Sequence, residues 1–158
     1  MIVRRAVCDC PPIPLPAIIL GSAGVVPLAL GVIMAAITRD VFGLPLIRLA
    51  IVYAAVILSF LGGMYWGMAS SALVARPGAS EPPGILGWSV VPALLGWIAA
   101  FLPPPVGASA LAVMFIAVLL LDRRCVLLRY VPGWWMRLRI GLTAAMVVVL
   151  LLLAVVSV

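Results

Sequence analysis

The stretch that most restricts how this chain can fold is Leu49–Ala75, which carries no charged residue. A helix over these residues is long enough to cross the hydrocarbon core of a bilayer, which is about 30 Å thick. Small residues recur along it at every fourth position, namely Ala55, Ser59, Gly63, Gly67 and Ser71. Such a series lies along one face of a helix, where another helix can approach closely. The sequence therefore predicts a membrane-spanning helix with a face built for helix packing.

Two interpretations of this small-residue face remain open. It can pack against other helices of the same chain, which is the commoner use of such motifs, or it can meet a second copy or another membrane protein. Under either interpretation, a leucine at Gly63 would disturb the fold or the assembly.

The composition makes lipid the natural solvent for the whole chain. Apolar residues make up 67% of the sequence and charged residues 9%, and a soluble domain could not cover so much apolar surface with polar groups. We expect a single membrane domain over residues 1–158. The apolar runs are continuous and do not alternate with polar residues, which excludes a transmembrane β-barrel.

Charges and prolines divide the chain into five apolar segments, at residues 13–38, 49–75, 84–102, 106–121 and 140–158. We interpret these as five transmembrane helices of an all-α bundle. Pro27 and Pro92 fall inside two of them and predict kinks, with a freed carbonyl bound by a neighbouring helix. The Pro103–Pro105 run predicts a tight hairpin between the third and fourth helices.

A polar segment over residues 122–139 separates the last two helices, and it mixes arginines with aromatic residues. Both residue types have an apolar body and a polar end, which suits the membrane–water boundary. We expect the segment to lie along the membrane surface and to contact lipid headgroups. The residues expected there are Arg123, Arg124, Arg129, Trp134, Trp135, Arg137 and Arg139.

The arginines also predict an orientation. Eight of the ten would lie on the side of the N-terminus and two, Arg39 and Arg48, on the other side. By the positive-inside rule, the N-terminus is cytoplasmic and the C-terminus periplasmic. All ten basic residues are arginine, and with the high Ala, Val, Gly and Pro content this suggests a GC-rich bacterial genome, so we expect the bacterial inner membrane.

Several functions are disfavoured by what the predicted spans lack. None contains an ionisable residue, which argues against proton pumps, ion channels and most intramembrane enzymes. The chain has no histidine, and its three cysteines, Cys8, Cys10 and Cys125, fall short of a closed zinc site. We therefore expect no metal, no cofactor and reduced thiols. The net charge of +6 is spread over helix ends, so nucleic acid is not an expected partner.

Aromatic residues leave one further choice open. Tyr65, Trp66 and Trp97 lie in or near glycine-rich stretches of the predicted spans. They could line a ligand pocket, although positions near the membrane interface explain them more simply.

Three segments together resemble a known family. They are Tyr53–Gly67, Gly87–Trp97 and the run from Asp122 through Pro132 to Thr143. The family consists of small membrane proteins of unknown function, found in proteobacteria and, as transmembrane protein sixty-nine, in mitochondria. The resemblance implies a helical inner-membrane protein and no established activity. One departure is Tyr65, where the family often has histidine. The positions that match the family pattern are Ser59, Phe60, Gly62, Gly63, Trp66, Gly67, Ser89, Pro92, Gly96, Trp97, Pro132, Trp134, Leu138 and Arg139.

These observations favour a non-catalytic accessory or assembly subunit surrounded by the lipid bilayer. The alternative is a carrier or binding bundle for a lipid or a neutral apolar molecule, in a cavity at the Pro27 and Pro92 kinks. An enzyme ranks third, and it would require rim arginines that converge with Asp122 on one cleft.

Overall fold

The computed structural model describes residues 12–38, 40–41, 44–75 and 84–158, and these form a helical bundle. The helices are α1 (Leu15–Ala23), α2 (Val26–Ile37), α3 (Leu46–Ala75), α4 (Ile85–Phe101), α5 (Pro104–Leu127) and α6 (Trp135–Val156). Four segments are long and apolar enough to cross a membrane, with α1 and α2 together forming the first, and α4 is a shorter apolar helix. The predicted all-α bundle of five helical segments is confirmed.

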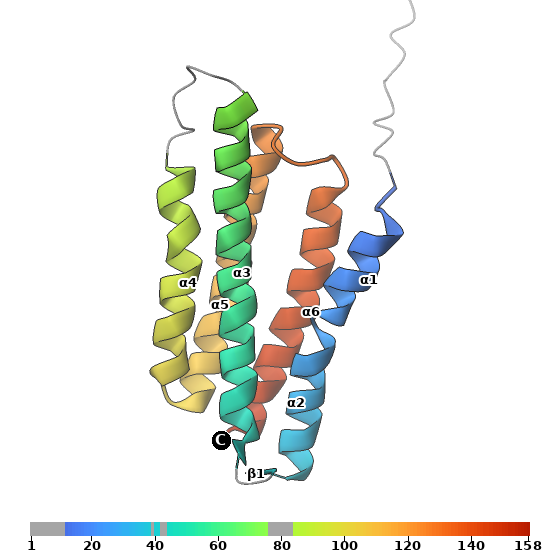
Figure 1. The fold of residues 1–158 in the computed structure, drawn as a ribbon. Helices are drawn as coiled ribbons and strands as arrows, with labels where there is room; N and C mark the ends of the chain where they lie inside the picture. Colours follow the sequence, from blue (N-terminus) through green and yellow to red (C-terminus); the bar gives the residue numbers. More distant parts are fainter. Residues whose placement is uncertain (1–11, 39, 42–43, 76–83) are drawn as a thin grey trace, which may run out of the picture.

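Helix α3 lies at the centre of the bundle (Figure 1) and packs against α2, α4 and α5. Helix α6 packs against α5 and against the α1–α2 segment. Consecutive segments run in alternating directions, so the start of α1 and the C-terminus lie at opposite ends of the bundle (Figure 1). The start of α1 shares its end of the bundle with the connection from α5 to α6.

The surface of the bundle is as apolar as its interior. Large apolar side chains face outward on every helix, for example Phe60, 68% exposed, and Leu120, 67% exposed. Leu58, Leu111 and Leu150 are fully buried in the core. Water would penalise so large an exposed apolar surface, whereas lipid tails would not. The distribution therefore agrees with a protein that spans the membrane.

The predicted kink in the first segment is present as a break between α1 and α2. Gly24 and Val25 separate the helices, and Pro27 lies in the first turn of α2, where its missing N–H costs nothing. The Tyr53 hydroxyl donates a hydrogen bond of 2.8 Å to the Gly24 carbonyl. A neighbouring helix thus supplies the hydrogen bond that this carbonyl needs at the break, which lipid tails could not supply.

The hairpin predicted at Pro103–Pro105 is also confirmed, since α4 ends at Phe101 and α5 begins at Pro104. At Gly107 a β-carbon would lie 2.6 Å from the Ala99 carbonyl oxygen, so the two helices meet there backbone to backbone. At the other turn of this end, β1 (Asp40–Val41) and β2 (Leu44–Pro45) form a short antiparallel hairpin. The sequence analysis did not predict these strands.

Helices α3 and α4 pack through glycines, but not through the predicted ones. A β-carbon at Gly62 would overlap the Ser89 carbonyl oxygen, and one at Gly96 would lie 3.2 Å from the Ala55 carbonyl oxygen. By contrast, a β-carbon at Gly63 or Gly67 would meet nothing within 4 Å. Of the predicted face, Ala55 is buried, Ser59 is half-buried, and the rest is exposed. The prediction that Gly63 packs against another helix of this chain is therefore wrong. The face of α3 that contacts α4 is the one that carries Gly62, one residue earlier.

Arg48 links the start of α3 to the end of α4. It lies in the first turn of α3, and its guanidinium donates hydrogen bonds to the carbonyls of Ala100, at 2.5 Å, and Leu102, at 3.0 Å. The last carbonyls of a helix have no intrahelical donor, and a cation there also interacts favourably with the helix dipole. Arg48 therefore caps α4 from α3.

The predicted surface segment over residues 122–139 is wrong in its extent. Helix α5 continues to Leu127 and α6 begins at Trp135, so only residues 128–134 connect them. The charged residues after Leu121 do not end the helix, because arginine has good helix propensity and its charge can reach the interface from the last turns.

Replacing Gly62 and Gly63 separately would test this packing. We expect Gly62→Ala to lower the free energy of unfolding by about 1–3 kcal/mol, because the added methyl overlaps the α4 backbone. Gly63→Ala is the matched control and should keep this free energy or raise it by up to about 1 kcal/mol, because its methyl meets nothing and alanine has the higher helix propensity. Thermal unfolding in dodecyl maltoside micelles measures both, and equal stability of the two variants would contradict the assigned interface.

Candidate functional site: a buried ion pair and the cavities beside it

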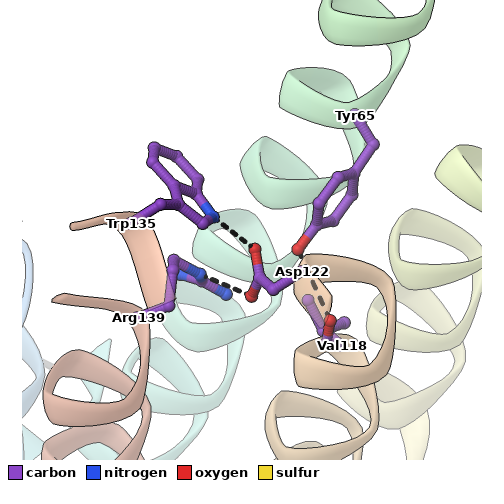
Figure 2. A network of polar contacts seen from close by, with 5 residues as sticks. All are labelled: Tyr65, Val118, Asp122, Trp135 and Arg139. Atoms are coloured by element: carbon purple, nitrogen blue, oxygen red, sulfur yellow. Dashed lines mark hydrogen bonds and ion pairs between the residues drawn. The ribbon is translucent and has the colours of Figure 1, made fainter. Parts of the chain in front are cut away.

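The most polar feature inside the bundle is an ion pair between α5 and α6 (Figure 2). Arg139 Nε donates to Asp122 Oδ2 at 2.7 Å, and Trp135 Nε1 donates to Asp122 Oδ1 at 2.8 Å. The Asp122 side chain is fully buried and that of Arg139 is 7% exposed. Both carboxylate oxygens are therefore bound by donors from the start of α6.

Helical periodicity explains why these residues face each other. The buried positions of α5 are spaced by three or four residues, and Asp122 continues the row that includes Leu111, Phe115 and Val118. Arg139 begins the corresponding buried row of α6, which continues through Thr143. Extending the α5 pattern past its last apolar residue would have revealed the pair. A helix that ends at Leu121, as the charges at residues 122–124 predict, leaves the pair out.

The assignment of Arg139 and Trp135 to lipid headgroups is therefore corrected. Arg139 is buried against Asp122, and the Trp135 indole is bound to the same carboxylate. A charge removed from water is stable in a bundle only when it is paired, so the pairing holds both side chains inward. Trp134, the neighbour of Trp135, is half-buried, and its ring centroid lies 6.0 Å from that of Trp135.

Tyr65 of α3 reaches the same network from the other side. Its ring is 1% exposed, and its hydroxyl points toward the turn of α5 that holds Val118 and Asp122 (Figure 2). The hydroxyl lies 3.5 Å from the Val118 carbonyl oxygen, which is a long and weak hydrogen bond. Three helices thus meet at Asp122.

Beyond the ion pair, exposed arginines lie in the last turns of α5, in the connection and in the first turn of α6. Arg129 has a positive φ of 56°, and the Tyr130 N–H donates to the Cys125 carbonyl at 2.9 Å. These features form a Schellman-type end for α5, usually made with glycine. Arg123, Arg124, Arg129 and Arg137 are all exposed. Of the arginines expected at the headgroups, Arg139 is the one that the described residues show paired with Asp122.

The aromatic residues predicted to line a pocket do not come together. Tyr65 is buried at the ion pair, whereas Trp66 is 52% and Trp97 63% exposed on the outside of the bundle. The Trp97 ring meets that of Phe101 edge to face, with centroids 5.3 Å apart. A pocket lined by all three is therefore wrong, because neighbouring positions on a helix point about 100° apart.

Two cavities lie near the predicted kinks, and neither is lined by Tyr65, Trp66 or Trp97. The first, of about 230 Å³, lies beside the α1–α2 break and includes Gly24, Phe60, Arg139 and Thr143 in its wall. The second, of about 220 Å³, lies between α4 and α5 beside Pro92 and includes Trp88 and Arg124. Both walls are mainly apolar, so each suits an apolar molecule.

The remaining candidates offer little chemistry within the described residues. Cys125 is a buried free thiol in α5. Cys8 and Cys10 lie outside the described residues, so the expectation of three reduced thiols remains a prediction. The carboxylate of Asp122 already accepts two hydrogen bonds and is shielded from solvent. The site is therefore built to hold helices together and to border a cavity.

The fold and this site define a small polytopic membrane protein of the helical class. The chain belongs to the family described as protein of unknown function DUF3429, whose sequence profile matches residues 13–155. It is 33% identical over 136 residues to Transmembrane protein 69 of Xenopus tropicalis, covering 85% of this chain and 51% of that relative. The chain thus spans about half the length of that relative, and no solved structure matches it. The family predicted from the three sequence segments is confirmed.

Breaking the ion pair from either side should destabilise the bundle. We expect Asp122→Asn and Arg139→Gln each to cost about 3–5 kcal/mol, because a buried charge or donor loses its partner. The double variant should lose less than the sum of the two, since it leaves no unpaired charge. Unfolding in detergent micelles measures this cycle, with the exposed Arg124→Gln as a control expected within about 0.5 kcal/mol. Strictly additive single effects would show that the two side chains do not interact.

Proposed function

We propose that this protein is a non-catalytic accessory or assembly subunit that binds another membrane protein through the outer face of α3. The observation that carries this proposal is the open space at Gly63 and Gly67, where an added β-carbon meets nothing within 4 Å. These two glycines form a G-x-x-x-G pair, which brings membrane helices into close contact. Within the chain, α3 uses Gly62 for its own packing, which leaves the pair available to a partner.

The surroundings of the pair support a helix-binding face. Ser59 precedes it by one turn and Ser71 follows it, and both hydroxyls donate to carbonyls of their own helix at 2.8 Å. Their polar groups are therefore satisfied and leave a flat surface. Phe60 and Trp66 stand exposed beside this strip and supply large contact areas. Helices in lipid gain little from the hydrophobic effect, so such a strip favours a partner through close packing.

The second candidate function is binding of a lipid or a neutral apolar molecule. It is favoured by the cavity beside the α1–α2 break, because that wall combines apolar side chains with a few polar groups. The two functions use different surfaces and do not exclude each other.

We further propose that the protein lies in the bacterial cytoplasmic membrane with its C-terminus outside the cell. The exposed Arg123, Arg124 and Arg129 cluster at the end of the bundle where α1 starts, whereas Arg48 lies at the other end. By the positive-inside rule, the arginine-rich end faces the cytoplasm. A fluorescent reporter after Val158 should then be dark and an alkaline phosphatase fusion active. A fluorescent fusion at Val158 would reverse this orientation.

Leucines on the open face should remove the partner and spare the fold. We expect the wild type to crosslink to a stoichiometric partner in native membranes and the double variant Gly63→Leu/Gly67→Leu to lose this crosslink. The midpoint of thermal unfolding of the variant should stay within about 2 °C of the wild type. Gly141→Leu is the matched control, since a β-carbon at Gly141 also meets nothing within 4 Å.

Energy transfer between two labelled copies in vesicles would separate self-association from binding of a different protein. If the wild type has no stoichiometric partner and no self-association, or if both persist in the double-leucine variant, the accessory function of this face is excluded.

A further inference from the structure

The cavity beside the α1–α2 break has two buried polar atoms in its wall residues that lack a partner. Within the part of the chain that the structure describes, Arg139 Nη2 and Thr143 Oγ1 make no hydrogen bond. Both residues line the cavity and lie one turn apart on α6. An unsatisfied buried polar group costs about 1–3 kcal/mol, and lipid cannot relieve it. The wall therefore has hydrogen-bonding capacity that the protein itself does not use.

Thr143 differs in this respect from serines elsewhere in the bundle. The hydroxyls of Ser59, Ser71 and Ser109 each donate to the carbonyl four residues earlier in their own helix. Thr143 could bind its own helix in the same way and does not. Its hydroxyl is therefore left for a group from outside the helix.

The charge balance of the site selects a neutral ligand. The carboxylate of Asp122 already neutralises the charge of Arg139, with Oδ2 and Nε 2.7 Å apart. An added anion would bring an uncompensated charge into a poorly solvated place, whereas a neutral acceptor would complete the guanidinium without that cost. A carbonyl oxygen has two lone pairs and accepts from both an N–H and an O–H.

The rest of the cavity selects an apolar body. Its volume of about 230 Å³ is several times the roughly 30 Å³ of a water molecule. Apolar side chains such as Leu20, Ile57 and Met146 form most of the wall. Leu20 is 73% exposed on the outside of α1, so the cavity borders the lipid.

We propose that this cavity binds a neutral amphipathic molecule whose carbonyl oxygen accepts hydrogen bonds from Arg139 and Thr143 and whose hydrocarbon part lies along α1 and α3. The proposal rests on the second function proposed above and names its ligand chemistry. The carbonyl belongs either to a prenyl-type quinone or to the ester of a neutral glycerolipid. Because the two donor atoms are covered in the wall, binding requires the neighbouring apolar side chains to shift.

The test uses the full chain in dodecyl maltoside and three probes, decylubiquinone, dioleoylglycerol and decylbenzene. A ligand that binds the folded state raises the midpoint of thermal unfolding in proportion to its concentration relative to Kd. We expect decylubiquinone or dioleoylglycerol, or both, to raise it, and the responding probe identifies the carbonyl source. Decylbenzene, which has no carbonyl, should bind at least tenfold more weakly than decylubiquinone.

Three variants locate the effect in this cavity. Ala17→Trp fills it from α1 and should abolish the stabilisation, whereas Ala23→Trp, on the exposed side of the same helix, should leave it unchanged. Thr143→Val keeps the side-chain shape and should raise Kd about tenfold, the usual effect of one lost hydrogen bond. The stability without ligand should stay equal or rise, because the hydroxyl has no partner to lose and its unsatisfied burial is removed.

The failures of the two proposals are distinguishable. If all three probes stabilise the wild type equally and Ala17→Trp abolishes this, the cavity binds apolar molecules but the carbonyl assignment is overturned. Unchanged affinity in Thr143→Val overturns it as well. If no probe acts, or if Ala17→Trp retains the full effect, both the ligand class and the binding function of this cavity are overturned.

Discussion

Hydrocarbon offers no hydrogen bonds, and this constraint governs the structure of this protein. Each backbone carbonyl released at a helix break or end must find a donor inside the bundle. The Tyr53 hydroxyl supplies one at Gly24, and the Arg48 guanidinium supplies two at the end of α4. These polar side chains thus bind backbone carbonyls that water would satisfy in a soluble protein. The same hydrogen bonds link helices that are distant in sequence.

The same constraint explains the form of the ion pair. A buried charge inside a membrane domain is costly unless an opposite charge and further donors surround it. Asp122 receives the Arg139 guanidinium and the Trp135 indole, both from the first turns of α6. The pair therefore sets the register between α5 and α6, with its Arg139 end at the wall of a cavity. Arg139 Nη2 makes no hydrogen bond within the described part of the chain, so a ligand in that cavity could supply its acceptor.

Close packing takes the role that the hydrophobic effect has in soluble proteins. Gly62 and Gly96 let α3 and α4 approach until side chain meets backbone. The segments that carry the family resemblance, around Gly62 and around Pro92, are the two sides of this interface. Gly63 and Gly67 belong to the same segment but face outward, so adjacent residues of one motif serve the inside of the bundle and its surface.

The sequence by itself determined the membrane environment, the family, the all-helical architecture and the hairpin at Pro103–Pro105, because apolar run length and proline act locally. It also placed a break in the first segment near Pro27. Only the tertiary structure decided that Gly62, and not Gly63, meets α4, and that Asp122 and Arg139 are paired inside the bundle. The outward position of Trp66 and Trp97 was decided at the same level. These outcomes depend on the rotation of each helix about its axis, and a helix that is apolar on all sides carries no periodic signal that fixes that rotation.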